Sequence, residues 1–180
     1  MAYSTNERRE LIQYLDKTRD DLLAAVRGLS EAQVNFQTSP KCWSIAGIVE
    51  HVALVEDAVF TRISQEITSV ASISADSSVN ENDAGLLRKA VDRSVKLEAP
   101  GQFHPTGKPM AISLEQFLAG RKKIVDFIQS THLDLRHIST QTRALGPLDG
   151  HQRLLFSAAH SARHAEQIIE TKEAPNFPTQ

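Results

Sequence analysis

The chain has 180 residues, of which 41% are hydrophobic and 23% are charged, and its formal net charge at pH 7 is −2. This length and composition suit one globular domain, so residues 1–180 are treated as a single domain. Acidic and basic residues are scattered along the whole sequence, and no basic stripe favours nucleic acid or an anionic membrane as a partner.

The cysteine content and the first residues bear on the cellular compartment. One cysteine, Cys42, excludes an intramolecular disulfide framework. The start, MAYSTNERREL, is polar and lacks the apolar core of a secretory signal. No apolar stretch approaches the length that crosses a bilayer. We therefore expect a soluble protein of a reducing compartment, the cytoplasm, with no membrane partner.

Two long helical patterns occupy the first third of the chain. Apolar residues at helical spacing predict a first helix that begins after a cap at Thr5 or Asn6 and ends at Gly28. Residues 30–42 are typical of a turn with a short helical piece. A second helix is predicted over residues 43–67 with Ser44 as its N-cap, although Gly47 stands where a capping-box glutamate would be.

The middle of the chain is predicted to be mostly irregular. Residues 68–83 are rich in Ser, Asn and Asp, which indicates a loop, and a short helix is predicted over residues 84–95. Residues 98–112 carry three prolines and two glycines and cannot continue that helix. A connection this long either lines the mouth of a functional site or is a solvated surface loop.

The last third of the chain completes the helical pattern. A third long helix is predicted over residues 113–130, with Ser113 as its cap and Gln116 at the capping-box position. Residues 131–150 are predicted to form an irregular connector. The last helix runs from about Leu148 to Thr171. No set of strands is predicted, so the fold class is all-α, a four-helix bundle with one long crossover loop.

The last helix contains a pair of histidines, His160 and His164, four residues apart in AAHSARHAEQI. This spacing places both on one face of a helix, in a row with Gln167, at the edge of an apolar stripe. That stripe is formed by Leu154, Ala158, Ala162, Ala165 and Ile169. Metal ligands belong at such an edge, but the polar flank of an ordinary core helix has the same pattern.

A third histidine, His51, lies on the second helix among the apolar neighbours Ile48, Leu54, Val55 and Ala58. It should therefore point into the bundle, where its nitrogens need partners. Either a carbonyl or side-chain acceptor satisfies the ring, or a metal binds one nitrogen and a hydrogen bond holds the other. Three imidazoles from two helices would hold a metal and leave one position open, as in catalytic sites.

Other residues with possible chemistry have simpler interpretations. His104 is read as a surface loop histidine, and His132, His137 and His151 as polar residues in or beside the connector to the last helix. Cys42 is expected to be a small buried residue and Trp43 a packing anchor. Glu50 and Glu56 should point away from His51, while the direction of Asp57 stays open. No HExxH motif is present, so a zincin-type protease is not supported.

Two segments carry a resemblance to a known family. WSIAGIVEHVALVED on the second helix and HSARHAEQI on the last helix resemble the signature segments of the DinB-like superfamily. Residues 133–155 are similar to the lead-in to that superfamily's last helix. The resemblance follows most of the chain in order and spacing. Gly47 departs from it, because relatives more often have a helix-favouring or acidic residue at this position.

The resemblance implies a four-helix bundle in up-down-down-up order, with a divalent metal held by His51, His160 and His164. It also implies a homodimer in many members. Characterised relatives include transferases that join a small-molecule thiol to an electrophile, and thiol-dependent isomerases. Many other members have no assigned activity.

The resulting hypothesis is a metal-dependent thiol S-transferase, with Gln167 orienting a substrate or a ligand; the alternative for Gln167 is an ordinary hydrated surface residue. A coordinated thiol is deprotonated at neutral pH, which produces the nucleophile that thiol transfer needs. The alternative is a metal-containing binding or stress-response module without turnover. A metal-free protein with satisfied core histidines is a third possibility. Three imidazoles accept Zn, Ni or Fe nearly equally, so the ligand set leaves the metal open.

Overall fold

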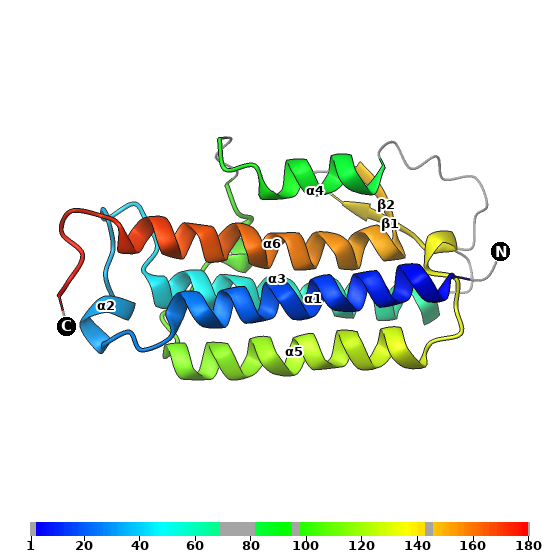
Figure 1. The fold of residues 1–180 in the computed structure, drawn as a ribbon, viewed down its shortest axis with the longest axis horizontal. Helices are drawn as coiled ribbons and strands as arrows, with labels where there is room; N and C mark the ends of the chain where they lie inside the picture. Colours follow the sequence, from blue (N-terminus) through cyan, green and yellow to red (C-terminus); the bar gives the residue numbers. More distant parts are fainter. Residues whose placement is uncertain (1–2, 69–81, 95–97, 143–145, 180) are drawn as a thin grey trace.

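Four long helices lie side by side around one core in the computed structural model, which describes residues 3–68, 82–94, 98–142 and 146–179 (Figure 1). The four are α1 (Thr5–Val26), α3 (Ile45–Thr68), α5 (Met110–Ser130) and α6 (Gly150–Lys172). Figure 1 shows α1 and α6 running in one direction and α3 and α5 in the other. The all-α class and the up-down-down-up order are therefore confirmed.

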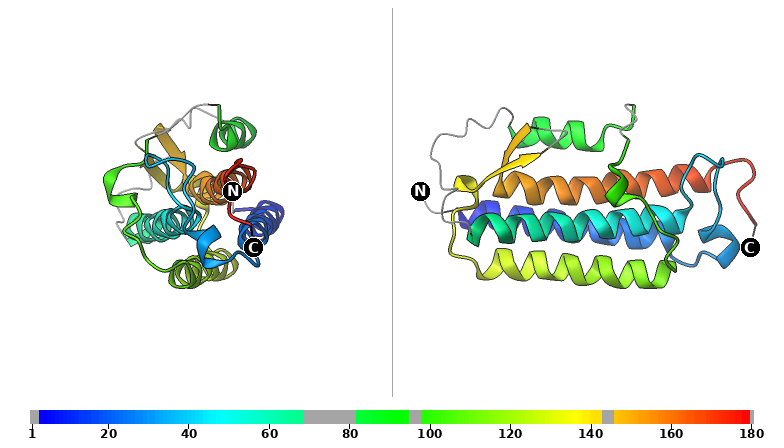
Figure 2. Two further views of the ribbon diagram at one scale, coloured as in Figure 1. Left: turned by 90° about the vertical axis from the view of Figure 1, so that its left-hand side faces the viewer. Right: turned by 180° about the vertical axis from the view of Figure 1, so that it is seen from behind.

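Shorter elements complete the chain. They are α2 (Glu31–Val34), α4 (Asp83–Val91), the 3₁₀ turns η2 (Gly101–Phe103) and η3 (Leu135–His137), and the strands β1 (Ser139–Thr142) and β2 (Gly146–Asp149). Helix α4 packs on the outer side of α6, away from α5 (Figure 2). Among the helices that the structure describes, none is both long and apolar enough to cross a membrane.

Side-chain caps fix where three of the long helices begin. Helix α1 is capped by Ser4 in a capping box with Glu7, one or two residues before the predicted caps. The predicted cap Ser44 accepts a hydrogen bond from the Gly47 backbone N–H at 3.1 Å. Helix α6 also begins with a capping box, between Asp149 and Gln152. These oxygens satisfy backbone donors that have no partner inside the helix.

The predicted start of the third long helix was wrong. Helix α5 begins at Met110 after Pro109, not at Ser113, although Ser113 and Gln116 match the capping-box pattern. Ser113 is fully buried, so its backbone lies inside the helix at the interface with the core. Pro109 suits the boundary because a proline has no N–H to leave without a partner.

The connector before α6 also differs from its prediction. Strands β1 and β2 form an antiparallel hairpin, with Ser139 paired to Asp149 and Thr142 paired to Gly146. Gly146 has a φ of 73°, a left-handed conformation that glycine adopts without strain. The predicted loop over residues 68–83 lies mostly outside the described residues. The predicted short helix is confirmed as α4, which ends at Val91.

A buried polar layer divides the apolar core into two clusters. Leu15, Val59 and Ile124 belong to one cluster, and Leu22, Val52 and Phe117 to the other. Between them the Arg121 guanidinium of α5 forms a two-bond ion pair with Glu56 of α3, and each side chain is 1% exposed.

All five N–H donors of Arg121 have acceptors, which lie on α1, α3 and α6. Ser157 donates a further hydrogen bond of 2.7 Å to Glu56. A buried charge is tolerated only when it is paired and hydrogen-bonded in this way. One residue pair therefore ties all four long helices together.

Candidate metal centre

Three histidine side chains from two helices converge at one point. His51 comes from the second turn of α3, and His160 and His164 come from the middle of α6. The Nε2 atom of His160 lies 3.1 Å from that of His51 and 3.2 Å from that of His164. The three residues form a group whose ligand atoms all lie within 4.8 Å of one another.

Hydrogen bonds on the far side of two rings assign their protons. The Nδ1 atom of His51 donates to the Phe103 carbonyl at 2.8 Å, and that of His164 donates to Gln167 Oε1 at 2.8 Å. A neutral imidazole has one N–H, so both Nε2 atoms present a lone pair to the cluster. His160 has at most one proton to offer them, which leaves a lone pair that a cation would satisfy.

The spacing of the nitrogens also suits a metal ion. Ligand nitrogens about 2.0–2.1 Å from a tetrahedral ion lie roughly 3.3 Å apart, close to the two separations in this cluster. Three neutral nitrogen donors suit a borderline divalent ion such as Zn, Ni or Fe. The residues present therefore fit the group that the sequence resemblance implies.

Burial keeps the three rings neutral. His51 is 4% exposed and His164 is 8% exposed, while His160 is partly buried. Burial, with a smaller contribution from the neighbouring His51, lowers the pKa of His164 to about 3. Burial likewise lowers the pKa of His51, and it lowers that of His160 well below 6.5. Neutral imidazole is the form that binds a metal, so the site is in a ligating state at neutral pH.

Aromatic rings and the crossover loop enclose the cluster. The Trp43 ring centroid lies 4.8 Å from that of His51, and the Phe156 centroid lies 5.8 Å from that of His160. The crossover loop, residues 98–112, reaches the cluster at η2, where the Phe103 carbonyl accepts the hydrogen bond from His51. Of the two interpretations of residues 98–112, the structure therefore favours a loop that lines the site. Trp43, expected only to anchor packing, is part of the wall.

Glu50 holds this loop against α3. Its carboxylate accepts hydrogen bonds from Thr106 Oγ1 at 2.6 Å and from the backbone N–H groups of Gly107 and Lys108 at 3.0 and 3.1 Å. Burial raises the pKa of Glu50, but these hydrogen bonds outweigh it and leave the pKa below its usual value. The prediction that Glu50 points away from His51 is consistent with these contacts. Its role in fixing the loop was not predicted, because the partners lie more than 50 residues away.

The remaining predicted residues lie outside the cluster. His104 is exposed on the loop, and its Nε2 pairs with the Ala99 carbonyl at 2.9 Å. His132 and His137 are exposed near η3, and Asp57 is exposed on α3. Cys42 is only partly buried, and Ser39 donates a hydrogen bond to its Sγ at 3.3 Å.

The expectation for His151 as a simple polar residue was incomplete. His151 lies in the first turn of α6 and is 5% exposed. Its ring forms a hydrogen bond with the Tyr3 hydroxyl, which comes from the segment before α1. Ile169 departs from the predicted apolar stripe, since it is 39% exposed.

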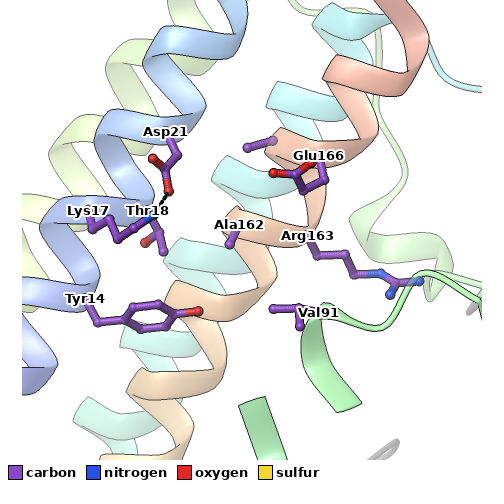
Figure 3. Close-up of a pocket in the computed structure, with 9 residues that line it drawn as sticks. Tyr14, Lys17, Thr18, Asp21, Val91, Ala162, Arg163 and Glu166 are labelled. Atoms are coloured by element: carbon purple, nitrogen blue, oxygen red, sulfur yellow. Dashed lines mark hydrogen bonds and ion pairs between the residues drawn. The ribbon is translucent and has the colours of Figure 1, made fainter. Parts of the chain in front are cut away.

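A shallow pocket between α1 and α6 is separate from the histidines (Figure 3). It has a volume of about 250 Å³ and includes the ion pair between Lys17 and Asp21. Ala162 forms part of its α6 wall, and Val91 at the end of α4 closes one side (Figure 3). None of the three histidines lines it, so the candidate chemistry does not lie in this pocket.

Comparison with known sequences agrees with this geometry. The sequence model of the DinB superfamily matches residues 14–168, a range that includes His51, His160 and His164. The chain belongs to the DinB superfamily. The resemblance found in WSIAGIVEHVALVED and HSARHAEQI is thereby confirmed. No curated protein matches the chain.

Two solved structures share this fold. One is YfiT from Bacillus subtilis, which is described as a probable metal-dependent hydrolase with an unusual four-helix bundle topology. It aligns with a TM-score of 0.61 at 15% sequence identity, and the alignment covers 97% of this chain and 91% of YfiT. TT2238, described as a four-helix bundle protein, aligns with a TM-score of 0.55 at 18% identity, covering 91% of this chain and 98% of that one. At these identities the likeness concerns the fold.

Proposed function

We propose that this DinB-superfamily protein is a divalent-metal-dependent enzyme that joins a small-molecule thiol to an electrophile. His51, His160 and His164 are the proposed metal ligands. The observation that carries the proposal is the convergence of three neutral Nε2 atoms from two helices. A bound metal supplies a positive charge at which a thiol loses its proton at neutral pH.

The residues around the cluster have supporting roles. Phe103 and Gln167 hold the His51 and His164 rings with their Nε2 atoms toward the metal position, as partners of metal-bound histidines do. This gives Gln167 the role of orienting a ligand. Trp43 and Phe156 provide apolar walls, which strengthen electrostatic interactions by excluding water.

The donor set favours thiol chemistry over hydrolysis. Within the described residues, the group that could hold a metal consists of histidines alone, without a carboxylate or cysteine. Metal-assisted hydrolysis usually uses a nearby carboxylate to accept a proton from water. A thiol is more acidic than water and needs no such base once it is coordinated. Hydrolysis remains the second candidate, because YfiT is described as a probable metal-dependent hydrolase.

The test uses the metal-loaded protein with monochlorobimane as the electrophile and cysteine, glutathione or N-acetylcysteine as the thiol. In the expected reaction the thiol proton goes to solvent, a C–S bond forms, and chloride leaves with the electron pair of the C–Cl bond. We expect metal-dependent formation of the fluorescent adduct above the spontaneous rate. His160→Ala should abolish it, and His104→Ala, which changes an exposed histidine outside the cluster, should not.

Two other outcomes would replace the proposal. Cleavage of p-nitrophenyl acetate without any thiol, dependent on the same three histidines, would make the protein a hydrolase. Tight thiol binding to the cobalt-loaded protein with no turnover of any electrophile would support the binding or stress-response module.

A further inference from the structure

One arginine on the helix that carries two of the histidines has a buried nitrogen without a hydrogen-bond partner among the residues that the structure describes. Arg153 of α6 is partly buried, and its Nε atom is fully shielded from solvent with no hydrogen-bond acceptor. In the described part of the chain, no carboxylate pairs with it, whereas the buried Arg121 and the partly buried Arg136 each have carboxylate partners. An unsatisfied buried donor costs free energy, and more so when it is charged, so its presence calls for a ligand.

Arg153 lies on the same face of α6 as the histidines. It precedes His160 by seven residues, which is two helical turns and an axial distance of about 10 Å. On α3, His51 and Arg62 are eleven residues apart, or three turns, and they also share a face. Helices α3 and α6 run in opposite directions (Figure 1), so Arg62 of α3 and Arg153 of α6 belong to the same end of this shared face. The two residues are close enough for the positive charge of Arg62 to lower the pKa of Arg153.

The charge at this end of the face is unbalanced. Arg62 has Glu66 as its ion-pair partner, and its side chain is 47% exposed. Arg153 has no such partner in the described ranges. Burial lowers the pKa of Arg153, and the positive charge of Arg62 lowers it further. An anion bound between the metal centre and Arg153 would neutralise the excess positive charge and would accept a hydrogen bond from the Arg153 guanidinium.

We propose that Arg153 binds an oxyanion group, a carboxylate or a phosphate, of a substrate whose reacting end lies at the three-histidine centre. The proposal rests on the proposed function and narrows its substrates to those that carry such an anion. A guanidinium matches either oxyanion with two parallel hydrogen bonds, and an ammonium group at this position would not reproduce that geometry.

The test is a ¹H–¹⁵N NMR titration that follows the Nε–H signal of Arg153, assigned by its loss in Arg153→Gln. Glutarate and 4-phosphonobutyrate carry two anionic groups, and butyrate carries one. With zinc-loaded protein we expect the first two to move the Arg153 signal and to bind about tenfold or more tightly than butyrate. Arg153→Gln should abolish that preference. Arg153→Lys should restore it only in part, and Arg88→Gln, at an exposed site on α4, should leave it unchanged.

The outcomes separate the two proposals. A preference for glutarate or for 4-phosphonobutyrate identifies the anion as carboxylate or phosphate. If no anion moves the Arg153 signal, or if the preference persists in Arg153→Gln, the role of Arg153 is refuted whether or not thiol transfer occurs. If the protein binds no zinc, the proposed function fails. The same titration of the metal-free protein then decides the role of Arg153, because the anion should still move its signal.

Discussion

Replacement of Arg121 by methionine tests whether the buried polar layer stabilises the bundle. The substitution keeps an unbranched side chain but removes five hydrogen bonds, including both to Glu56. Glu56 is 1% exposed and would keep Ser157 as a partner, so a carboxylate would remain buried without a compensating charge. Removing one member of a buried ion pair typically costs about 3–5 kcal/mol.

Urea unfolding followed by circular dichroism measures this loss. With a slope of about 2 kcal/mol per molar urea, the midpoint should fall by roughly 1.5–2.5 M. Lys122→Met is the matched control, since Lys122 is the neighbouring residue, its side chain is 74% exposed, and its ion pair is with Asp126. Exposed pairs contribute about 0–1 kcal/mol, so the midpoint of the control should shift little. An Arg121→Met midpoint within about 0.5 M of wild type would refute the reasoning.

Three further predictions concern the surroundings of the site and the start of α6. Gln167→Leu should weaken metal binding by about 10- to 100-fold in a chelator competition, because the His164 ring loses the partner that orients it; unchanged affinity would contradict this. Glu50→Ala should speed hydrogen exchange of the Gly107 and Lys108 amides, which lose their acceptor, and unaltered protection would exclude this role for Glu50. Burial lowers the pKa of His151 to about 4. The stability that the buried neutral ring contributes is therefore complete above the unfolded-state pKa of about 6.5. As the pH falls from about 6.5 toward 4, the unfolded state takes up the proton first, and the free energy of unfolding falls by up to about 3 kcal/mol. Metal-free His151→Gln should show a flatter stability profile over this range, and a profile parallel to that of the wild type would count against it.

The long helices could be predicted because burial repeats with the helical period. Leu11, Leu15 and Leu22 recur on one face of α1, and all three are almost completely buried. Boundaries were less predictable, since they depend on tertiary context. Ser113 has the local pattern of a cap, yet packing against the core places it inside α5.

The hairpin between η3 and α6 could not be predicted from local patterns. Its strands have four residues each and lack alternating apolar residues, and β2 includes Pro147. Pairing between the two strands, and contacts of the hairpin with α3 and α6, define it instead. Short strands of this kind carry little local signal.

Part of the candidate site could be predicted from the sequence. The spacing of His160 and His164 places them on one face, and the apolar neighbours of His51 direct it inward. Their meeting depends on α3 packing beside α6, which the family resemblance implied but spacing alone did not. The roles of Phe103 and Glu50 could not be predicted, since a backbone carbonyl leaves no sequence signal and the loop partners of Glu50 are distant in the chain.

The central claim is that these three histidines bind one metal ion, and metal analysis of the purified protein tests it most directly. Mass spectrometry of the folded protein, with elemental analysis after dialysis against divalent ions, should give about one metal per chain. His51→Ala, His160→Ala and His164→Ala should each lose it while keeping the helical circular dichroism spectrum, and His104→Ala should retain it. Near-stoichiometric metal in all three folded variants would contradict the claim.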